Sequence, residues 1–161
     1  MKHLWMACLL ALPALGDVHK GQAAALFDLP GLDGQRVKLE ALRGKVVLLD
    51  FWASWCAPCK EELPELGKLA AEYRQKGVEV VTINVDSDRA SAAELVKRLK
   101  LTLRVGLDPR GDKAAGQYGP ETIPASYIID RRGIVRAIHN GFRGADDLAK
   151  FREEIDALLR S

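Results

Sequence analysis

Residues 45–76 constrain the fold of this chain more than any other segment. An apolar, β-branched run (KVVLLDFW) occupies Lys45–Trp52 and is typical of a strand that is covered on both faces of its sheet. Helical periodicity follows over Lys60–Lys76. Between them lie Cys56 and Cys59, separated by two residues. A dithiol at a strand-to-helix junction is a redox signature, because the two thiols can form a disulfide, release it and exchange it with another protein.

The position of Cys56 at the start of the helix predicts a reactive thiol. A helix N-terminus leaves N–H groups unpaired and carries about half a positive charge, which favours thiolate over thiol. Cys59 lies one turn further on and should be more buried. We therefore assign Cys56 as the attacking nucleophile and Cys59 as the resolving thiol. Pro58 suits the first helical turn, where no backbone N–H is needed.

Half of a structural zinc site is the alternative interpretation of the pair. Zinc takes about four ligands, usually from two such pairs. The other possible zinc ligands do not form a second pair at the short sequence spacing typical of zinc sites. They are His3, Cys8, His19 and His139. We therefore expect no metal, and a redox-active disulfide between Cys56 and Cys59 in place of a cofactor.

The first sixteen residues differ from the rest of the 161-residue chain. Leu4–Leu15 is almost wholly apolar after a basic start, and small residues precede Asp17 at the spacing that signal peptidase reads. This stretch is shorter than the roughly 20 residues that span a bilayer as a helix. We predict a secretory signal over Met1–Gly16, cleaved before Asp17, with an uncleaved anchor or a lipoprotein signal at Cys8 as alternatives. Residues 17–161 would then form one periplasmic domain.

Charge and cysteine count narrow the class of protein. The formal net charge is +2 and the basic residues are spread along the chain, so nothing indicates a nucleic-acid or polybasic membrane surface. Removal of the signal would leave only two cysteines, fewer than a disulfide-stabilised exported domain carries. The pair is therefore expected to serve chemistry, in a protein that we expect to be a monomer.

The rest of the chain alternates predicted strands and helices. Two short strands, Ala25–Pro30 and Arg36–Glu40, flank an Asp33–Gly34 turn. The later elements are strands at Val78–Val85, Leu103–Leu107, Ala125–Asp130 and Ile134–Asn140, and helices at Arg89–Lys100, Asp112–Tyr118 and Asp146–Leu159. Crossover helices make the middle strands parallel, and the late hairpin adds antiparallel ones. The predicted fold is α/β, with a mixed central sheet, helices on both faces and an extra N-terminal β-hairpin.

With these motifs the chain resembles the thioredoxin superfamily. The matches are Leu49–Ala53 (LDFWA), Trp55–Lys60 (WCAPCK), Pro64 and Thr122–Pro124 (TIP). The hairpin before the first long strand is similar to that of the exported TlpA-like branch, which includes thiol reductases of cytochrome c maturation. The resemblance covers roughly residues 25–160 and implies a thioredoxin fold that exchanges disulfides with proteins.

The resemblance also implies roles for residues around the dithiol. Pro124 matches the family's cis-proline, which lies against the dithiol and lets Ile123 present its backbone to a peptide that adds as a β-strand. Trp55 would shield the nucleophile and contact partners, beside Ala57 and Pro58. An aromatic cap on the edge of the core is the alternative for Trp55.

Asp50 places a carboxyl group inside the apolar strand. Burial should raise its pKa, so that it can take and return the proton of Cys59. Thioredoxins carry Asp at this place, which implies the same role, whereas many TlpA-like proteins have an uncharged residue. The alternative is a partly solvated residue without a role. We expect Glu61 and Glu62 on a solvated helix face, although the TlpA-like pattern often has Glu at the second position, and we expect His139 to be solvated as well.

The predicted activity is extracytoplasmic reduction of protein disulfides. The Cys56 thiolate would attack the substrate disulfide, and Cys59 would resolve the mixed disulfide. Ala57 and Pro58 resemble the Gly-Pro pair of reducing thioredoxins more than the His-containing pairs of oxidases, which favours a reductant. An oxidising compartment then requires a membrane thiol donor, and apocytochrome c is one candidate substrate.

Three other activities are the alternatives. A disulfide oxidase or isomerase uses the same site and differs in redox potential. A peroxiredoxin-type peroxidase needs Pro and Thr or Ser seven and three residues before its reactive cysteine, but those places hold other residues: Trp52 and Cys56, or Leu49 and Ala53. A copper carrier would add a histidine near the late turn, where this chain has Ile123.

Overall fold

The computed structural model describes residues 17–161, so the predicted signal lies outside the described residues. A five-stranded sheet has the order β5-β4-β3-β6-β7. Its strands are β3 (Val46–Trp52), β4 (Val78–Asn84), β5 (Arg104–Leu107), β6 (Ala125–Ile129) and β7 (Val135–Asn140). The β3–β4 and β4–β5 pairs are parallel, whereas β3–β6 and β6–β7 are antiparallel. The mixed sheet predicted from the sequence is confirmed.

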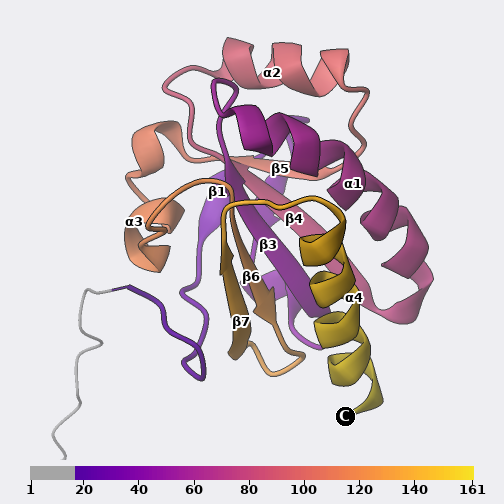
Figure 1. The fold of residues 1–161 in the computed structure, drawn as a ribbon. Coiled ribbons are helices and arrows are strands. Elements are labelled where there is room, and N and C mark those ends of the chain that lie inside the picture. Colours follow the sequence, from indigo (N-terminus) through magenta and orange to yellow (C-terminus); the bar gives the residue numbers. More distant parts are fainter. Residues whose placement is uncertain (1–16) are drawn as a thin grey trace, which may run out of the picture.

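Helices cover both faces of this sheet, as predicted (Figure 1). They are α1 (Ala57–Tyr73), α2 (Arg89–Arg98), α3 (Ala114–Tyr118) and α4 (Ala145–Arg160), with 3₁₀ turns at Glu40–Leu42, Arg74–Lys76 and Pro109–Gly111. α1 and α4 lie side by side on one face, where the Tyr73 hydroxyl donates a hydrogen bond of 2.9 Å to Asp156. α3 packs on the other face through Tyr118, whose ring meets Phe51 and Tyr127.

The predicted N-terminal hairpin forms a separate two-stranded sheet. It consists of β1 (Asp28–Pro30) and β2 (Arg36–Lys38), paired antiparallel. Leu29 and Val37 are buried in the same cluster as α3, so the hairpin covers the face of the main sheet that α1 leaves free.

The ends of α1 follow local sequence signals. The helix begins at Ala57, earlier than its periodicity predicts, because Cys56 is already its N-cap. The 3₁₀ turn that follows the helix ends at Gly77, whose φ of +82° is a left-handed conformation that glycine adopts without steric cost. Asp88 caps α2 by accepting a 2.9 Å hydrogen bond from the Ser91 N–H, as expected. Within residues 17–161, no helix combines the length and apolar character that a membrane crossing requires.

The strand β3 positions the site. All seven of its residues are buried, which confirms the prediction of a strand covered on both faces. Side chains alternate between the faces, so Leu48 and Asp50 point toward α1 and α4. In the register of the sheet Asp50 is opposite Ser126, and Ser126 is opposite His139. Three polar side chains therefore form one row across β3, β6 and β7.

Candidate active site

Cys56 and Cys59 form a disulfide at the N-terminus of α1, with an S–S distance of 2.09 Å. Sγ of Cys56 accepts a hydrogen bond of 3.3 Å from the Cys59 N–H, so one sulfur occupies the anion-favouring position of the helix. Cys56 is 5% exposed and Cys59 is fully buried. The expected difference in burial between the two cysteines is confirmed, with Cys59 the more buried of the two.

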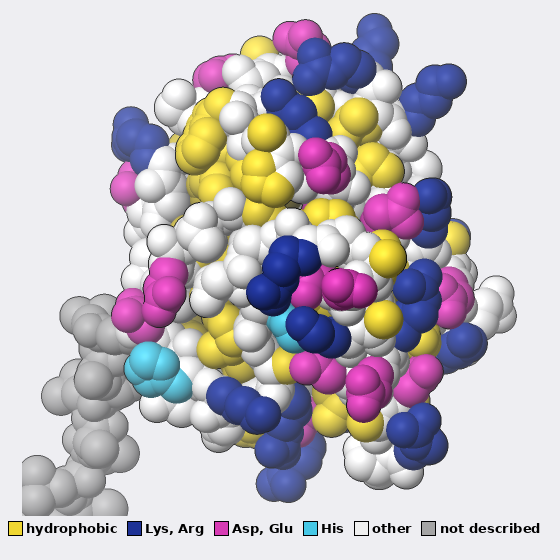
Figure 2. All heavy atoms as spheres, in the orientation of Figure 1, with side chains coloured by type: hydrophobic (Ala, Val, Ile, Leu, Met, Phe, Trp, Pro, Cys, Tyr) yellow, Lys and Arg dark blue, Asp and Glu magenta, His cyan; other side chains and the backbone are white. Residues whose placement is uncertain are grey.

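Apolar side chains that form a rim, Trp55, Ala57, Pro58 and Ile123, lie at the dithiol end of the sheet. Trp55 is 70% exposed, and Ala57 and Pro58 are exposed beside it. Ile123 is half-buried and packs against the cluster that contains both cysteines, and its bond to Pro124 is cis, as predicted. Hydrophobic side chains gather at the upper part of the molecular face in Figure 2, over the region where α1 begins in Figure 1. The structure thus brings all five predicted substrate-contact residues to the dithiol end of the sheet.

A hydrogen-bonded clamp, which the sequence reasoning missed, holds the turn before Trp55. Both carboxyl oxygens of Asp86 accept from the Ser54 backbone N–H, at 3.1 and 3.0 Å, and one also accepts from the Ser54 hydroxyl at 3.0 Å. The side-chain amide of Asn84 donates a 2.7 Å hydrogen bond to the same carboxyl group. The signal available in the sequence is the polar pair Asn84 and Asp86 at the carboxyl end of β4, the end at which the parallel strand β3 leads into the dithiol.

Two buried carboxyl groups share one hydroxyl below the dithiol. Asp50 and Glu62 are both fully buried. The Ser126 hydroxyl lies 3.0 Å from Oδ1 of Asp50 and 3.2 Å from Oε1 of Glu62. Within the described chain, the second oxygen of each carboxyl group is buried without a hydrogen-bond partner. The prediction of a solvated Glu62 is therefore wrong, because α1 turns this side chain toward the sheet; Glu61 is exposed, as expected.

Burial raises the pKa of both carboxyl groups. Desolvation raises the pKa of Asp50 well above its usual value, the charge of Glu62 raises it further, and the hydrogen bond from Ser126 opposes both effects. Desolvation also raises the pKa of Glu62 to about 8, opposed by Ser126 and assisted by the charge of Asp147 on α4. The expected direction for Asp50 is confirmed, and Glu62 is a second buried acid whose pKa is raised.

His139 is not solvated as predicted. Its side chain is 13% exposed, and Nε2 lies 2.7 Å from a carboxylate oxygen of Glu154 on α4. Its ring packs edge-to-face on Phe151, with a centroid distance of 5.0 Å. The histidine is therefore held between β7 and α4, because α4 covers the part of β7 that was predicted to face solvent.

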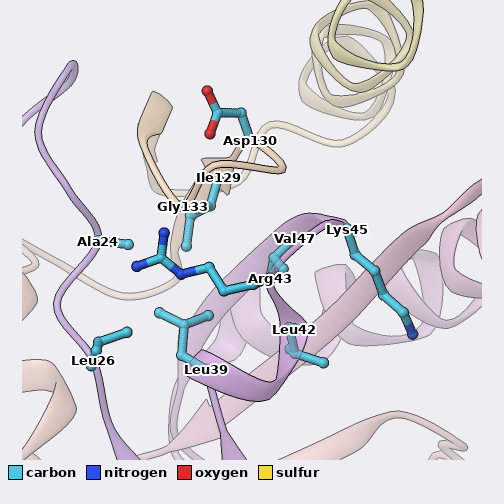
Figure 3. Close-up of a pocket in the computed structure, with 10 residues that line it drawn as sticks. All are labelled: Ala24, Leu26, Leu39, Leu42, Arg43, Lys45, Val47, Ile129, Asp130 and Gly133. Carbon is cyan, nitrogen blue, oxygen red and sulfur yellow. The ribbon is translucent and has the colours of Figure 1, made fainter.

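A pocket lies near the opposite end of β3 (Figure 3). The Arg43 side chain extends across it toward Gly133, beside Ala24 and Leu39, and donates to the Arg132 carbonyl. The cavity that remains has a volume of about 10 Å³, hardly enough for one water molecule. Across residues 17–161, no cluster of three His, Cys, Asp or Glu side chains could hold a metal ion. The dithiol end therefore remains the candidate active site.

The first helix of the mixed sheet begins at a disulfide, and Ile123, which precedes the cis-proline, packs against the cluster that contains both cysteines. These features define a thioredoxin-fold protein of the dithiol–disulfide class. More particularly, the chain belongs to the AhpC/TSA family, which it matches over residues 20–138. It is a homologue of thiol–disulfide oxidoreductases of the ResA and DsbE type. This bears out the resemblance inferred from the sequence.

Three relatives illustrate the homology. The thiol-disulfide oxidoreductase ResA of Bacillus cereus is 36% identical over 115 residues, which cover 71% of this chain and 66%, just under two thirds, of the relative. A structure assigned as the thiol:disulfide interchange protein DsbE of Chlorobium tepidum is 39% identical with a TM-score of 0.84, covering 89% of this chain and 99% of the other. A secreted Mycobacterium tuberculosis disulfide oxidoreductase is 26% identical with a TM-score of 0.70, covering 82% and 96%.

Proposed function

We propose that this protein reduces disulfide bonds of other proteins outside the cytoplasm, through thiol–disulfide exchange at Cys56 and Cys59. The observation that carries the proposal is the asymmetric disulfide at the start of α1, with one cysteine slightly exposed beside apolar residues and the other fully buried. In this mechanism the Cys56 thiolate attacks the substrate disulfide, and Cys59 releases the reduced product. The redox-active pair replaces any cofactor.

Two observations support an extracytoplasmic location. Met1–Gly16 has the composition of a secretory signal, and one structural relative is described as secreted. In an oxidising compartment a reductant must itself be re-reduced. A membrane protein that presents a thiol pair to the Cys56–Cys59 disulfide is the proposed donor.

The direction of electron flow is argued from the two residues between the cysteines. Ala57 and Pro58 offer no imidazole to stabilise a Cys56 thiolate, so the reduced form is less favoured than in a His-containing oxidase and the protein is more reducing. Equilibration of the purified protein with dithiothreitol or glutathione buffers measures this preference. A potential near about −270 mV supports a reductase, whereas one near about −120 mV would make it a disulfide-forming oxidase.

The proposed substrate is an extended protein segment that carries a disulfide. Ile123 forms no backbone-to-backbone hydrogen bond within residues 17–161, so its peptide group can pair with a docking strand. Exposed Trp55 would contact the flanking residues of such a segment. On the resemblance to the TlpA-like branch, oxidised apocytochrome c is our candidate, and a disulfide-bonded CxxCH peptide tests it against a peptide with the same residues in scrambled order.

Cysteine variants test the chemistry itself. Cys56→Ser should abolish reduction of insulin disulfides, because no thiol remains at the accessible position. Cys59→Ser should accumulate mixed disulfides, because the resolving sulfur is lost. Reduction of insulin by Cys56→Ser at the wild-type rate would disprove the assignment.

A further inference from the structure

We infer that Asp50 and Glu62 act as one acid–base unit that shares a single proton through the hydroxyl of Ser126. The inference rests on the proposed function for its purpose, because the shared proton would serve Cys59. Its geometric basis is independent of any substrate: two fully buried carboxyl groups, from β3 and α1, both lie within hydrogen-bond distance of one serine hydroxyl on β6.

The hydrogen count on the serine requires at least one proton on the pair. A hydroxyl group has one hydrogen to donate, so Ser126 can donate to Asp50 or to Glu62 but not to both. The other contact is a hydrogen bond only if that carboxyl group is protonated and donates to the serine oxygen. Both contacts, 3.0 and 3.2 Å long, are therefore satisfied when the pair holds one proton.

The alternative protonation states are less favourable in this position. If both groups were ionised, two negative charges would be buried together, and one carboxylate would face a lone pair of the Ser126 oxygen. If both were protonated, the strong hydrogen bond between the hydroxyl and a carboxylate would be lost. Ser126 therefore stabilises the singly protonated pair relative to both other states, which is the behaviour of a coupled dyad.

The charged groups around the pair do not supply a compensating cation. Asp147 of α4 contributes a negative charge toward Glu62, and its own ion-pair partners are Arg143 and Lys150. His139 is the cross-strand neighbour of Ser126 on β7, and its Nε2 is held by Glu154. On β4, the register neighbour of Asp50 is the uncharged Thr82. Retaining a proton is thus the remaining way to reduce the buried charge.

The pair lies where it can serve Cys59. Glu62 follows Cys59 by three residues, on the same buried stripe of α1. Asp50 precedes Trp52 by two residues on β3, on the same face of the sheet, and Trp52 packs in the cluster that contains Cys59. A singly protonated pair can give its proton to a Cys59 thiolate or take one from a Cys59 thiol.

The proton step balances in both directions. When a partner dithiol reduces the protein, its thiolate bonds to Sγ of Cys56, the Cys56–Cys59 bond breaks, and Cys59 leaves as a thiolate that takes the proton of the pair. The second partner thiolate then attacks the partner's own sulfur and releases Cys56 as a thiolate. Two electrons pass from the partner, which leaves as a disulfide, and the pair recovers its proton from solvent. In the substrate direction the pair accepts the Cys59 proton, and the Cys59 thiolate attacks Sγ of Cys56 in the mixed disulfide. The Cys56–Cys59 bond forms, the substrate sulfur leaves as a thiolate, and the pair releases its extra proton to solvent.

Carboxyl titration of the oxidised protein tests this inference. The side-chain carboxyl carbons of Asp50 and Glu62 are followed by carbon-detected NMR from about pH 4 to about pH 10. Because Ser126 favours the intermediate state, Ser126→Ala should raise the lower titration step and lower the upper one, each by about one pH unit. Ser126→Thr, which returns the hydroxyl, should restore the wider separation.

Two further variants make the result specific. Thr82→Val removes a hydroxyl from the opposite neighbour of Asp50, one that contacts the Arg104 carbonyl instead, and should leave both steps in place. In an Asp50→Asn background Ser126→Ala should raise the pKa of Glu62, because only a hydrogen bond to the charged form is lost. The effect of Ser126→Ala on the upper step thus reverses its sign when the pair is broken.

The outcomes divide clearly. An interval between the two steps that shrinks in Ser126→Ala and not in Thr82→Val supports the shared proton. An interval that stays constant or widens, including a parallel rise of both steps, overturns it. Infrared spectroscopy of the wild-type protein at neutral pH gives a second reading: protonated-carboxyl absorption equivalent to one group per molecule supports the shared proton, and absorption equivalent to two groups overturns it. Because the disulfide stays closed, the outcome is separate from that of insulin reduction, which tests the proposed function.

Discussion

Glu62→Gln should make the folded protein more stable at alkaline pH and remove much of its pH dependence. The wild-type side chain is fully buried and has one oxygen without a hydrogen-bond partner in the described structure. Gln has nearly the same shape and cannot ionise, so the substitution isolates the cost of keeping an acid at this place. In the folded variant, the side-chain amide oxygen of Gln can still accept a hydrogen bond from the Ser126 hydroxyl.

The magnitude follows from linkage between protonation and folding. The pKa of Glu62 rises from its ordinary value of 4.5 in the unfolded chain to about 8 in the folded one. Between these values the folded state binds more protons, so the free energy of unfolding decreases as pH rises and levels off above about pH 8. Each unit of difference is worth about 1.4 kcal/mol, which gives an upper bound of about 5 kcal/mol across the interval.

Urea unfolding of the oxidised protein at pH 5, 6, 7 and 8 measures this difference. The free energy of unfolding of wild type should fall across the series, whereas that of Glu62→Gln should fall much less. Glu61→Gln is the matched control, because the neighbouring side chain is exposed and its loss should leave the slope unchanged. Equal slopes for Glu62→Gln and wild type would refute the reasoning, since they would mean that Glu62 titrates in the folded protein as it does in the unfolded chain.

Three other variants have distinct expected results. Asp50→Asn should slow the release of the mixed disulfide by Cys59 more than the first attack of Cys56 on the substrate, so that the mixed disulfide persists for longer in quenched-flow experiments. Equal effects on both steps would mean that Asp50 has only a structural role. Asp86→Ala should destabilise the protein by about 1–3 kcal/mol in urea unfolding, because it leaves the buried Asn84 amide and the half-buried Ser54 N–H without their acceptor, and a change below about 0.5 kcal/mol would show that the clamp is dispensable. Asp147→Asn should lower the pKa of Glu62 in a carboxyl titration, since it removes a negative charge that raises it; a pKa that stays in place would contradict that coupling.

The elements that could be predicted depend on local patterns. The apolar run of β3 and the dithiol define their own surroundings, so the buried strand, a helix starting near the dithiol and the raised pKa of Asp50 all followed from the sequence. Glu62 had a usable signal, because it is three residues after Cys59 and four before Leu66 on the buried stripe of α1. We predicted a solvated side chain because Glu is usually charged, whereas the structure shows that its position on the helix determines its burial.

The remaining site residues depend on contacts far apart in the chain. Ser126 meets the two carboxyl groups only through the pairing of β6 with β3 and the packing of α1, neither of which has a local signature. Asp86 reaches Ser54 only because β4 ends beside the turn that follows β3. His139 is enclosed by α4, whose position relative to β7 the sequence did not give.

The contrast between Trp55 and the sulfur beside it has a consequence for selectivity. A large aromatic side chain is 70% exposed, while the neighbouring Cys56 is only 5% exposed. A small thiol or oxidant gains little from the aromatic surface and must still reach a recessed sulfur, whereas a protein segment covers the indole and is guided to the sulfur by the same contact. Discrimination between different protein disulfides is then exercised by contact area before any bond is exchanged, and intrinsic thiol reactivity can stay modest.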